Sequence, residues 1–150
     1  MDELYSSLLD LLKEESAVVE RLVDFGKGEV AALKEDDIST LRSVIDRQEE
    51  QMKKFLILEQ RRAEILEDIG GPDGLEHAGK AKEDLEMEGS RLAARLEELA
   101  AVNETNRLLA NQAFTFATMV QQALTDVTGG YDEKGQRTDS QGFTTIDTSA

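Results

Sequence analysis

An apolar repeat with alternating steps of three and four residues constrains the fold of this chain more than any other feature. Spacing of this kind places residues along one face of a helix that packs against other helices. The repeat is most regular between residues 38 and 69, where seven of ten seam positions are apolar: Ile38, Leu41, Ile45, Gln48, Met52, Phe55, Glu59, Arg62, Leu66 and Ile69. The helix is expected to end there, because Gly70-Gly71-Pro72 is a strong terminator.

Two further segments carry the same period. The first, residues 2–34, has the seam Leu4, Leu8, Leu11, Glu15, Val18, Leu22 and Phe25. In it, Gly26 and Gly28 lower helix propensity and permit a bend or the close approach of another helix. The second, residues 74–128, has regular heptads from Leu92 onward, and glycines interrupt its charged first third between residues 79 and 89. Between the first two helices, Asp36 or Asp37 is a candidate helix cap.

These segments predict an all-α fold: an antiparallel, coiled-coil-like three-helix bundle with long helices. We expect residues 1–128 to form a single helical domain. Residues 129–150 are rich in Gly, Ser, Thr, Asp and Gln, and we expect them to form a disordered, flexible tail. At 1.5 Å per residue the third segment exceeds the first two, so roughly 30 Å of it must find another partner or bend back.

The composition excludes several functions. A net charge of −15 disfavours nucleic-acid binding, and the absence of Cys rules out thiolate metal sites and Cys nucleophiles. The only histidine, His77, has neither a nucleophile motif nor a Glu-x-x-His partner, so we expect no enzyme activity, no metal and no cofactor. Weak binding of a divalent cation by acidic pairs such as Glu14-Glu15 is an alternative. With no signal peptide and no span of 18 apolar residues, we expect a cytoplasmic protein without membrane insertion.

Residues 108–125 are 18 consecutive residues without a charge, in a chain that is one-third charged. Loss of charge together with Phe and Met enrichment is typical of the core of a protein interface. The stretch therefore predicts a partner-binding helix, and two other readings remain open: the most buried part of the bundle core, or a homodimer interface. The candidate contact residues are Leu108, Leu109, Phe114, Phe116, Met119, Val120, Ala123 and Leu124.

Polar residues interrupt the seams. Asn103 and Asn106 are expected to form a structural polar seam that fixes which helices pair, and a polar contact to a partner is the alternative. Arg62 is expected to be a structural donor, and Glu15 and Glu59 are expected where the bundle opens to water.

Five pieces of the sequence, in this order and spacing, resemble the FlgN-type flagellar export chaperones. They are LLDLLKEE (residues 8–15), EVAALKEDDISTL (29–41), LEQRRAEIL (58–66), NETNRLL (103–109) and GGYDEKG (129–135). The resemblance implies a type III export chaperone that binds the two hook–filament junction proteins, which are hook-associated proteins, and prevents their premature association. It also implies that clients bind the C-terminal helix at residues 108–124, and that Tyr131 docks at the export gate.

The alternative is a homodimeric helical-bundle adaptor with no flagellar role, whose uncharged stretch is its own dimer interface. In the chaperone interpretation, the free protein is a monomer or a weak homodimer.

Overall fold

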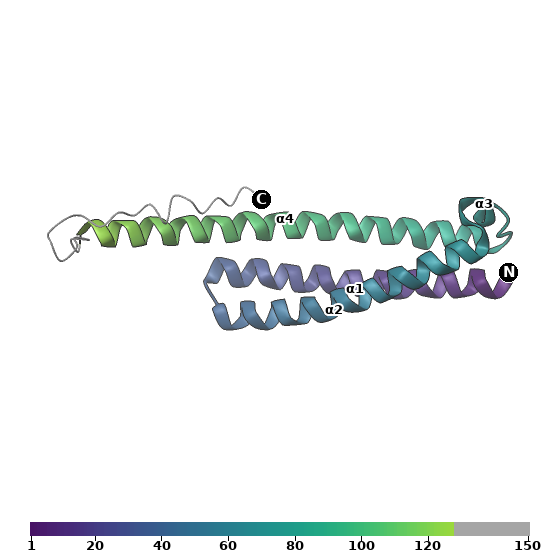
Figure 1. Ribbon diagram of the computed structural model, residues 1–150, viewed down its shortest axis with the longest axis horizontal. Helices are drawn as coiled ribbons and strands as arrows, with labels where there is room; N and C mark the ends of the chain where they lie inside the picture. The colour runs from purple at the N-terminus through teal and green to yellow at the C-terminus, as the bar shows by residue number, and fades with distance from the viewer. Residues whose placement is uncertain (128–150) are drawn as a thin grey trace. The chain divides into compact units, whose positions relative to one another are not determined.

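The computed structural model describes residues 1–127, which form four helices and no strand (Figure 1). They are α1 (Asp2–Glu35), α2 (Ile38–Ile69), α3 (Gly71–Glu76) and α4 (Ala81–Val127). These residues fall into two compact units: unit 1, Met1–Asn106, and unit 2, the part of the chain from Arg107 onward. The all-α prediction with long, packed helices is confirmed. The predicted tail, residues 129–150, lies outside the described residues.

The link between α1 and α2 follows from two adjacent aspartates. Asp36 ends α1 in the left-handed conformation, with φ of 54°. Asp37 then caps α2, because its carboxylate accepts hydrogen bonds from the Thr40 backbone N–H at 3.1 Å and the Thr40 hydroxyl at 2.6 Å. These bonds to the ionised form lower the pKa of Asp37.

The third predicted segment is divided between two helices. Residues 77–80 are not helical, and Gly79 within them has φ of 59°. Gly89, by contrast, lies inside α4 without interrupting it. The short helix α3 has no side-chain cap. Its last residue, Glu76, accepts a hydrogen bond of 2.6 Å from the Lys82 ammonium of α4, across the non-helical residues 77–80. That bond lowers the pKa of Glu76 and raises the pKa of Lys82.

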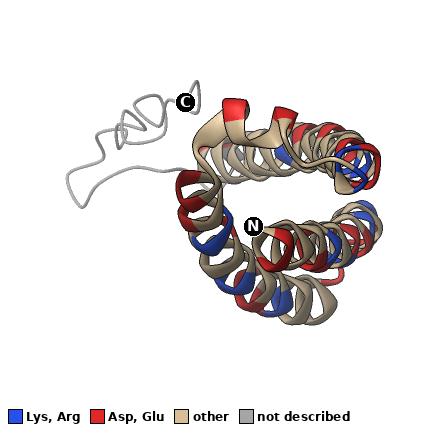
Figure 2. Ribbon diagram, turned by 90° about the vertical axis from the view of Figure 1, so that its right-hand side faces the viewer, with Lys and Arg blue, Asp and Glu red and all other residues tan. Residues whose placement is uncertain are grey.

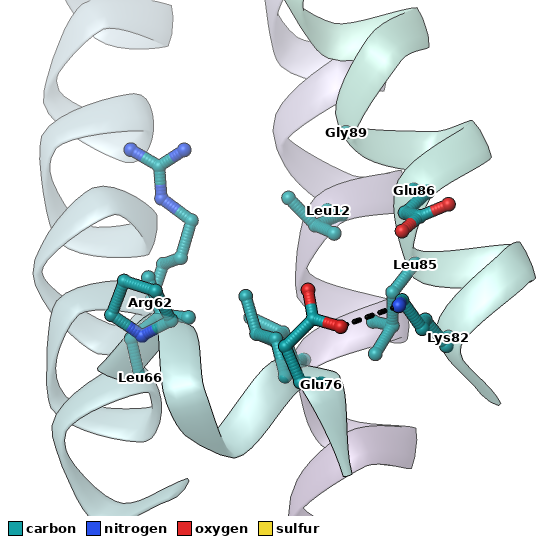
Figure 3. A pocket seen from close by; sticks show the side chains of 11 residues that line it. Leu12, Arg62, Leu66, Glu76, Lys82, Leu85, Glu86 and Gly89 are labelled. Carbon is teal, nitrogen blue, oxygen red and sulfur yellow. Dashed lines mark hydrogen bonds and ion pairs between the residues drawn. The ribbon is translucent and has the colours of Figure 1, made fainter. Parts of the chain in front are cut away.

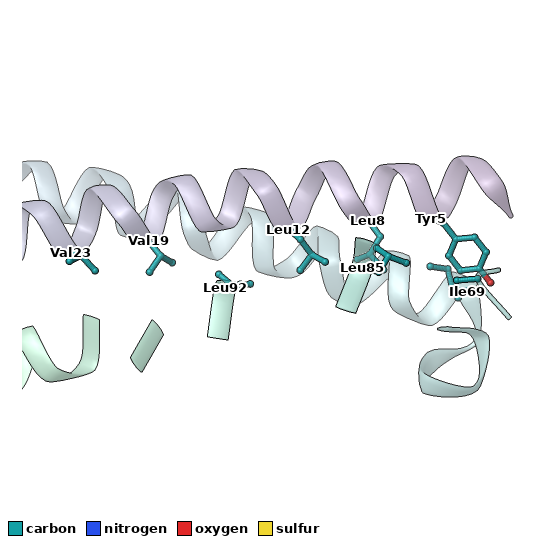
Figure 4. Close-up of a cluster of buried hydrophobic side chains, with 9 residues drawn as sticks. Tyr5, Leu8, Leu12, Val19, Val23, Ile69, Leu85 and Leu92 are labelled. Atoms are coloured by element: carbon teal, nitrogen blue, oxygen red, sulfur yellow. The ribbon is translucent and has the colours of Figure 1, made fainter. Parts of the chain in front are cut away.

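Unit 1 is organised around α1, which packs against both α2 and the first part of α4. The main buried cluster joins α1 to α4 and to the end of α2 (Figure 4): Tyr5, Leu8, Leu12, Val19, Val23, Ile69, Ala78, Leu85 and Leu92. A second cluster joins α1 to α2 and comprises Leu11, Val18, Leu22 and Leu58. At the N-terminal end, the Tyr5 hydroxyl donates a buried hydrogen bond of 2.7 Å to the Gly74 carbonyl oxygen. The two faces of α1 therefore hold the unit together.

The buried face of α2 overlaps its predicted seam in part. The seam residue Ile69 is buried, and Phe55 and Leu66 pack against the core. Ile38, Ile45 and Met52 of the same seam are 69%, 38% and 42% exposed. The helix is rotated so that Leu58, outside the seam, meets α1, which turns one half of the seam outward.

Gly26 allows a close approach of α1 to α4. A Cβ placed on Gly26 would lie 2.5 Å from Val102 Cγ1 of α4. At the same level, the Asn106 side-chain amide donates a buried hydrogen bond of 2.9 Å to the Gly26 carbonyl oxygen. The expectation that a glycine in the first helix permits a close helix contact is confirmed at Gly26.

We predict that Gly26→Ala lowers the free energy of unfolding by about 1–3 kcal/mol, because the added methyl group overpacks the contact with Val102. This loss exceeds the roughly 1 kcal/mol that alanine gains over glycine inside a helix. Urea unfolding followed by circular dichroism measures the change.

Gly28→Ala is the matched control, since a Cβ there would lie an ordinary 3.7 Å from Val44 Cγ2. It should raise the free energy of unfolding by up to about 1 kcal/mol through helix propensity alone. Equal gains from both variants would contradict a tight contact at Gly26.

Candidate functional site

The uncharged stretch, residues 108–125, lies entirely within α4 and belongs to the second unit. Several of its polar side chains are satisfied by the helix itself. The hydroxyl of Thr118 donates to the Phe114 carbonyl oxygen at 3.0 Å, and that of Thr125 donates to the Gln121 carbonyl oxygen at 3.0 Å. Such back-bonding leaves the threonines with less need of another partner.

Most of the predicted contact residues share one side of this helix. At about 100° per residue, seven of the eight fall within an arc of about 160°. We call this the apolar arc: Leu108, Leu109, Phe116, Met119, Val120, Ala123 and Leu124. Phe116 lies at its centre, whereas Phe114 lies on the far side of the helix among threonines and glutamines. A helix partner covers an arc of this width.

The large side chains of the apolar arc are exposed. The exposed fraction is 50% for Leu108, 69% for Phe116, 63% for Met119, 40% for Val120 and 58% for Leu124. Leu109 is half-buried, and Phe114, outside the arc, is 41% exposed. The alternative that this stretch is the most buried part of the core does not fit these fractions. A contiguous exposed apolar face of this kind marks an interaction surface.

The two seam asparagines have different environments. Asn106 is 5% exposed and bonds to Gly26 through its amide nitrogen, while its side-chain oxygen has no hydrogen-bond partner in the structure. Asn103 is exposed and lines a hollow between α1, α2 and α4. The structure thus gives Asn106 a contact between helices and leaves Asn103 accessible.

Glu15 is the main departure from expectation in the polar seam. Its side chain is fully buried and not open to water, and neither carboxyl oxygen accepts a hydrogen bond. The Arg62 guanidinium lies 3.5 Å from Glu15 and 3.7 Å from Glu59, which confirms Arg62 as a structural partner. Burial raises the pKa of Glu15, Arg62 opposes that rise, and Glu59 adds to it. This burial was not predictable from the sequence, because a glutamate on an apolar seam usually lies where the helix bundle opens to water.

The described residues offer little for metal or catalytic chemistry. Among residues 1–127, no group of three or more His, Asp or Glu side chains is placed to hold a metal ion. His77 is exposed, beside the start of α4. No helix in this part of the chain is both long and apolar enough to cross a membrane. Tyr131, the expected docking residue, lies outside the described residues.

Charge is distributed unevenly along the helices. Acidic and basic residues are interspersed along the helices (Figure 2), and ion pairs such as Lys27–Glu98 at 3.4 Å join α1 to α4. The 18 residues of the uncharged stretch have no such groups. The apolar arc therefore lies in a stretch of the described chain where no charged side chain keeps the surface hydrated.

Comparison with known proteins places the chain in a family. A family model described as "FlgN protein" matches residues 1–139, which is most of the chain. No curated protein and no solved structure gives a significant match.

We predict that the free energy of unfolding of the Glu15→Gln variant, relative to that of the wild type, is higher at pH 7.5 than at pH 4.5. Because the native state raises the pKa of Glu15 above its ordinary 4.5, it holds a proton that the unfolded chain has released. As pH rises from the unfolded toward the folded pKa of Glu15, this carboxyl group therefore costs the wild type stability that the glutamine variant keeps. Urea unfolding of both proteins across this pH range tests the prediction.

Glu14→Gln, at the exposed neighbouring carboxylate, controls for the loss of one negative charge. A difference between Glu15→Gln and the wild type that is independent of pH would show that the Glu15 carboxylate is not desolvated.

Proposed function

Because the chain belongs to the FlgN family, we propose that it is a cytoplasmic export chaperone that binds flagellar hook-associated proteins. In this role it keeps its clients, the hook–filament junction proteins, from associating before type III export. Docking of the loaded chaperone at the export gate through Tyr131 is part of the same proposal.

The exposed apolar arc of α4 is the observation that supports this function best. Five large apolar side chains of the arc are 40–69% exposed, in a stretch with no charged residue to keep it solvated. Burying them against a client removes apolar surface from water, at about 25 cal/mol per Å². An amphipathic client helix is the natural partner, because it presents anchors at the same 3.6-residue period.

The acidic character of the chain suits such a role. A net charge of −15 opposes self-association of the free chaperone and attracts basic client surfaces. In this arrangement, charge brings the client near and the uncharged arc holds it.

The same arc keeps a second candidate open: a homodimeric adaptor that buries the arc against another copy. Sedimentation of the free chain distinguishes the two. A stable dimer whose interface is lost when the arc is mutated, with no binding to hook-associated proteins, would favour the adaptor.

We predict that Phe116→Ala weakens binding to a hook-associated protein by about 1–3 kcal/mol, because Phe116 lies at the centre of the apolar arc. Isothermal titration calorimetry with the full chain measures this loss. The melting temperature should stay close to that of the wild type, since Phe116 is 69% exposed.

Phe114→Ala is the matched control, with the same substitution two residues away on the other side of the helix. It should retain most of the affinity. Equal losses from the two variants would contradict a one-sided arc, and a matching fall in melting temperature would place Phe116 in the folded core instead.

A further inference from the structure

We infer that unit 1 binds a helix of the client in a groove between α2 and α4, where that helix becomes the fourth helix of the bundle. This inference rests on the proposed function and adds a second binding surface to it. Two hollows, the walls of three helices and the pattern of charge support it.

The first hollow, about 340 Å³, lies near the α3 end of unit 1 (Figure 3). Its apolar lining includes Leu12 of α1, Leu66 of α2 and Leu85 of α4. The ion pair between Glu76 and Lys82 lies at its edge, and Gly89 contributes a wall without a side chain. An apolar cavity of about 150 Å³ already accommodates benzene, so this hollow can hold a large apolar side chain.

The second hollow, about 260 Å³, lies further along the same three helices. It is lined by Leu22 of α1, by Gln48, Glu49 and Met52 of α2, and by Leu99 and Asn103 of α4. Met52 is 42% exposed and is its most accessible apolar side chain on α2.

The two hollows open toward similar sides of the three helices. On α1, the lining residues Leu8, Leu12 and Leu22 lie within about 80° of one another. On α2 and on α4, the lining residues of both hollows lie within about 140°. The floor from Leu8 to Leu22 is roughly 20 Å long, so a helix laid along it reaches both hollows. We take the two hollows as the ends of one groove, about four helical turns in length.

The walls of this groove select a helix as the occupant. The wall on α2 carries Met52, from the part of the regular seam that stays exposed, and the wall on α4 carries Leu96, which is 37% exposed, and Leu99. A seam with a 3.5-residue repeat fits the side chains of another helix between its own. Two such seams that face one groove specify a helix better than an extended peptide or a small molecule.

The charges along the groove indicate a basic client helix and not a second copy. Arg62 is paired with Glu15 and Glu59, and Lys82 with Glu76. Within the residues that the structure describes, Glu49 and Glu86 make no ion pair. These two carboxylates favour Lys or Arg on the partner, whereas another copy would bring its own charge of −15.

The test measures binding of full-length chaperone variants to the hook-associated proteins of the same organism by calorimetry. Met52→Glu places a carboxylate inside the second hollow, and Gly89→Leu fills the first. Each should weaken binding about tenfold or more. Circular dichroism should show folded variants, because Met52 is partly exposed and a Cβ on Gly89 meets no atom within 4 Å.

Leu56→Glu is the matched control: it adds the same charge one turn along α2, at a leucine that is 56% exposed and lines neither hollow. It should bind within about twofold of the wild type. If Met52→Glu and Gly89→Leu bind like the wild type while Phe116→Ala does not, the groove inference is overturned and the chaperone function stands.

Two other outcomes also decide against the groove as a client site. A free chain that sediments as a dimer, and as a monomer after Met52→Glu, would show that a second copy fills the groove. If the wild type binds no hook-associated protein, the proposed function falls together with the groove.

Discussion

The burial of α1 on two sides is the constraint on which unit 1 depends. One face, from Tyr5 to Val23, packs toward α4, and the face that carries Leu11, Val18 and Leu22 packs toward α2. Because α1 packs against both α2 and α4, these two helices do not need to pack against each other along their whole length. Their facing sides are left with apolar side chains in contact with water. The groove follows from a bundle in which one helix serves as the centre for two others.

Sequence periodicity located the helices well because Leu and Val at helical spacing leave few alternatives. It identified only part of the buried face of α2, which carries Phe55, Leu66 and Ile69, because Ile45 and Met52 are as apolar as Leu58 and Ile65. The decision is made by tertiary contact with α1, which no local pattern encodes. The burial of Glu15 was missed for a similar reason: its partner Arg62 is 47 residues away in the sequence. Gly26 was the favourable case, since a glycine within an apolar stripe has few explanations besides a close contact.

For the candidate site, the absence of charge in residues 108–125 was visible without any structure. The structure adds the helical state and the exposure of the side chains, and helix geometry then separates Phe116 from Phe114. Composition alone could not separate these two phenylalanines, since they are only two residues apart in the sequence. The second surface could not be predicted at all. It requires the hollow beside Met52 and the hollow beside Gly89 to lie on one side of a three-helix unit.

The hydrogen bond between Asn106 and Gly26 also marks where the part of the chain that unfolds as one cooperative unit ends. Asn106 is the last residue of unit 1, and its buried amide is the final polar link from α4 to α1 in that unit. The helix after it buries little of its own apolar surface, and most of the stability of a helix in a protein comes from such tertiary packing. Residues 107–127 can therefore unwind and re-form as a separate foldon while the bundle stays intact. Under the proposed function, this division lets the apolar arc adapt its conformation to more than one client without repacking of the core.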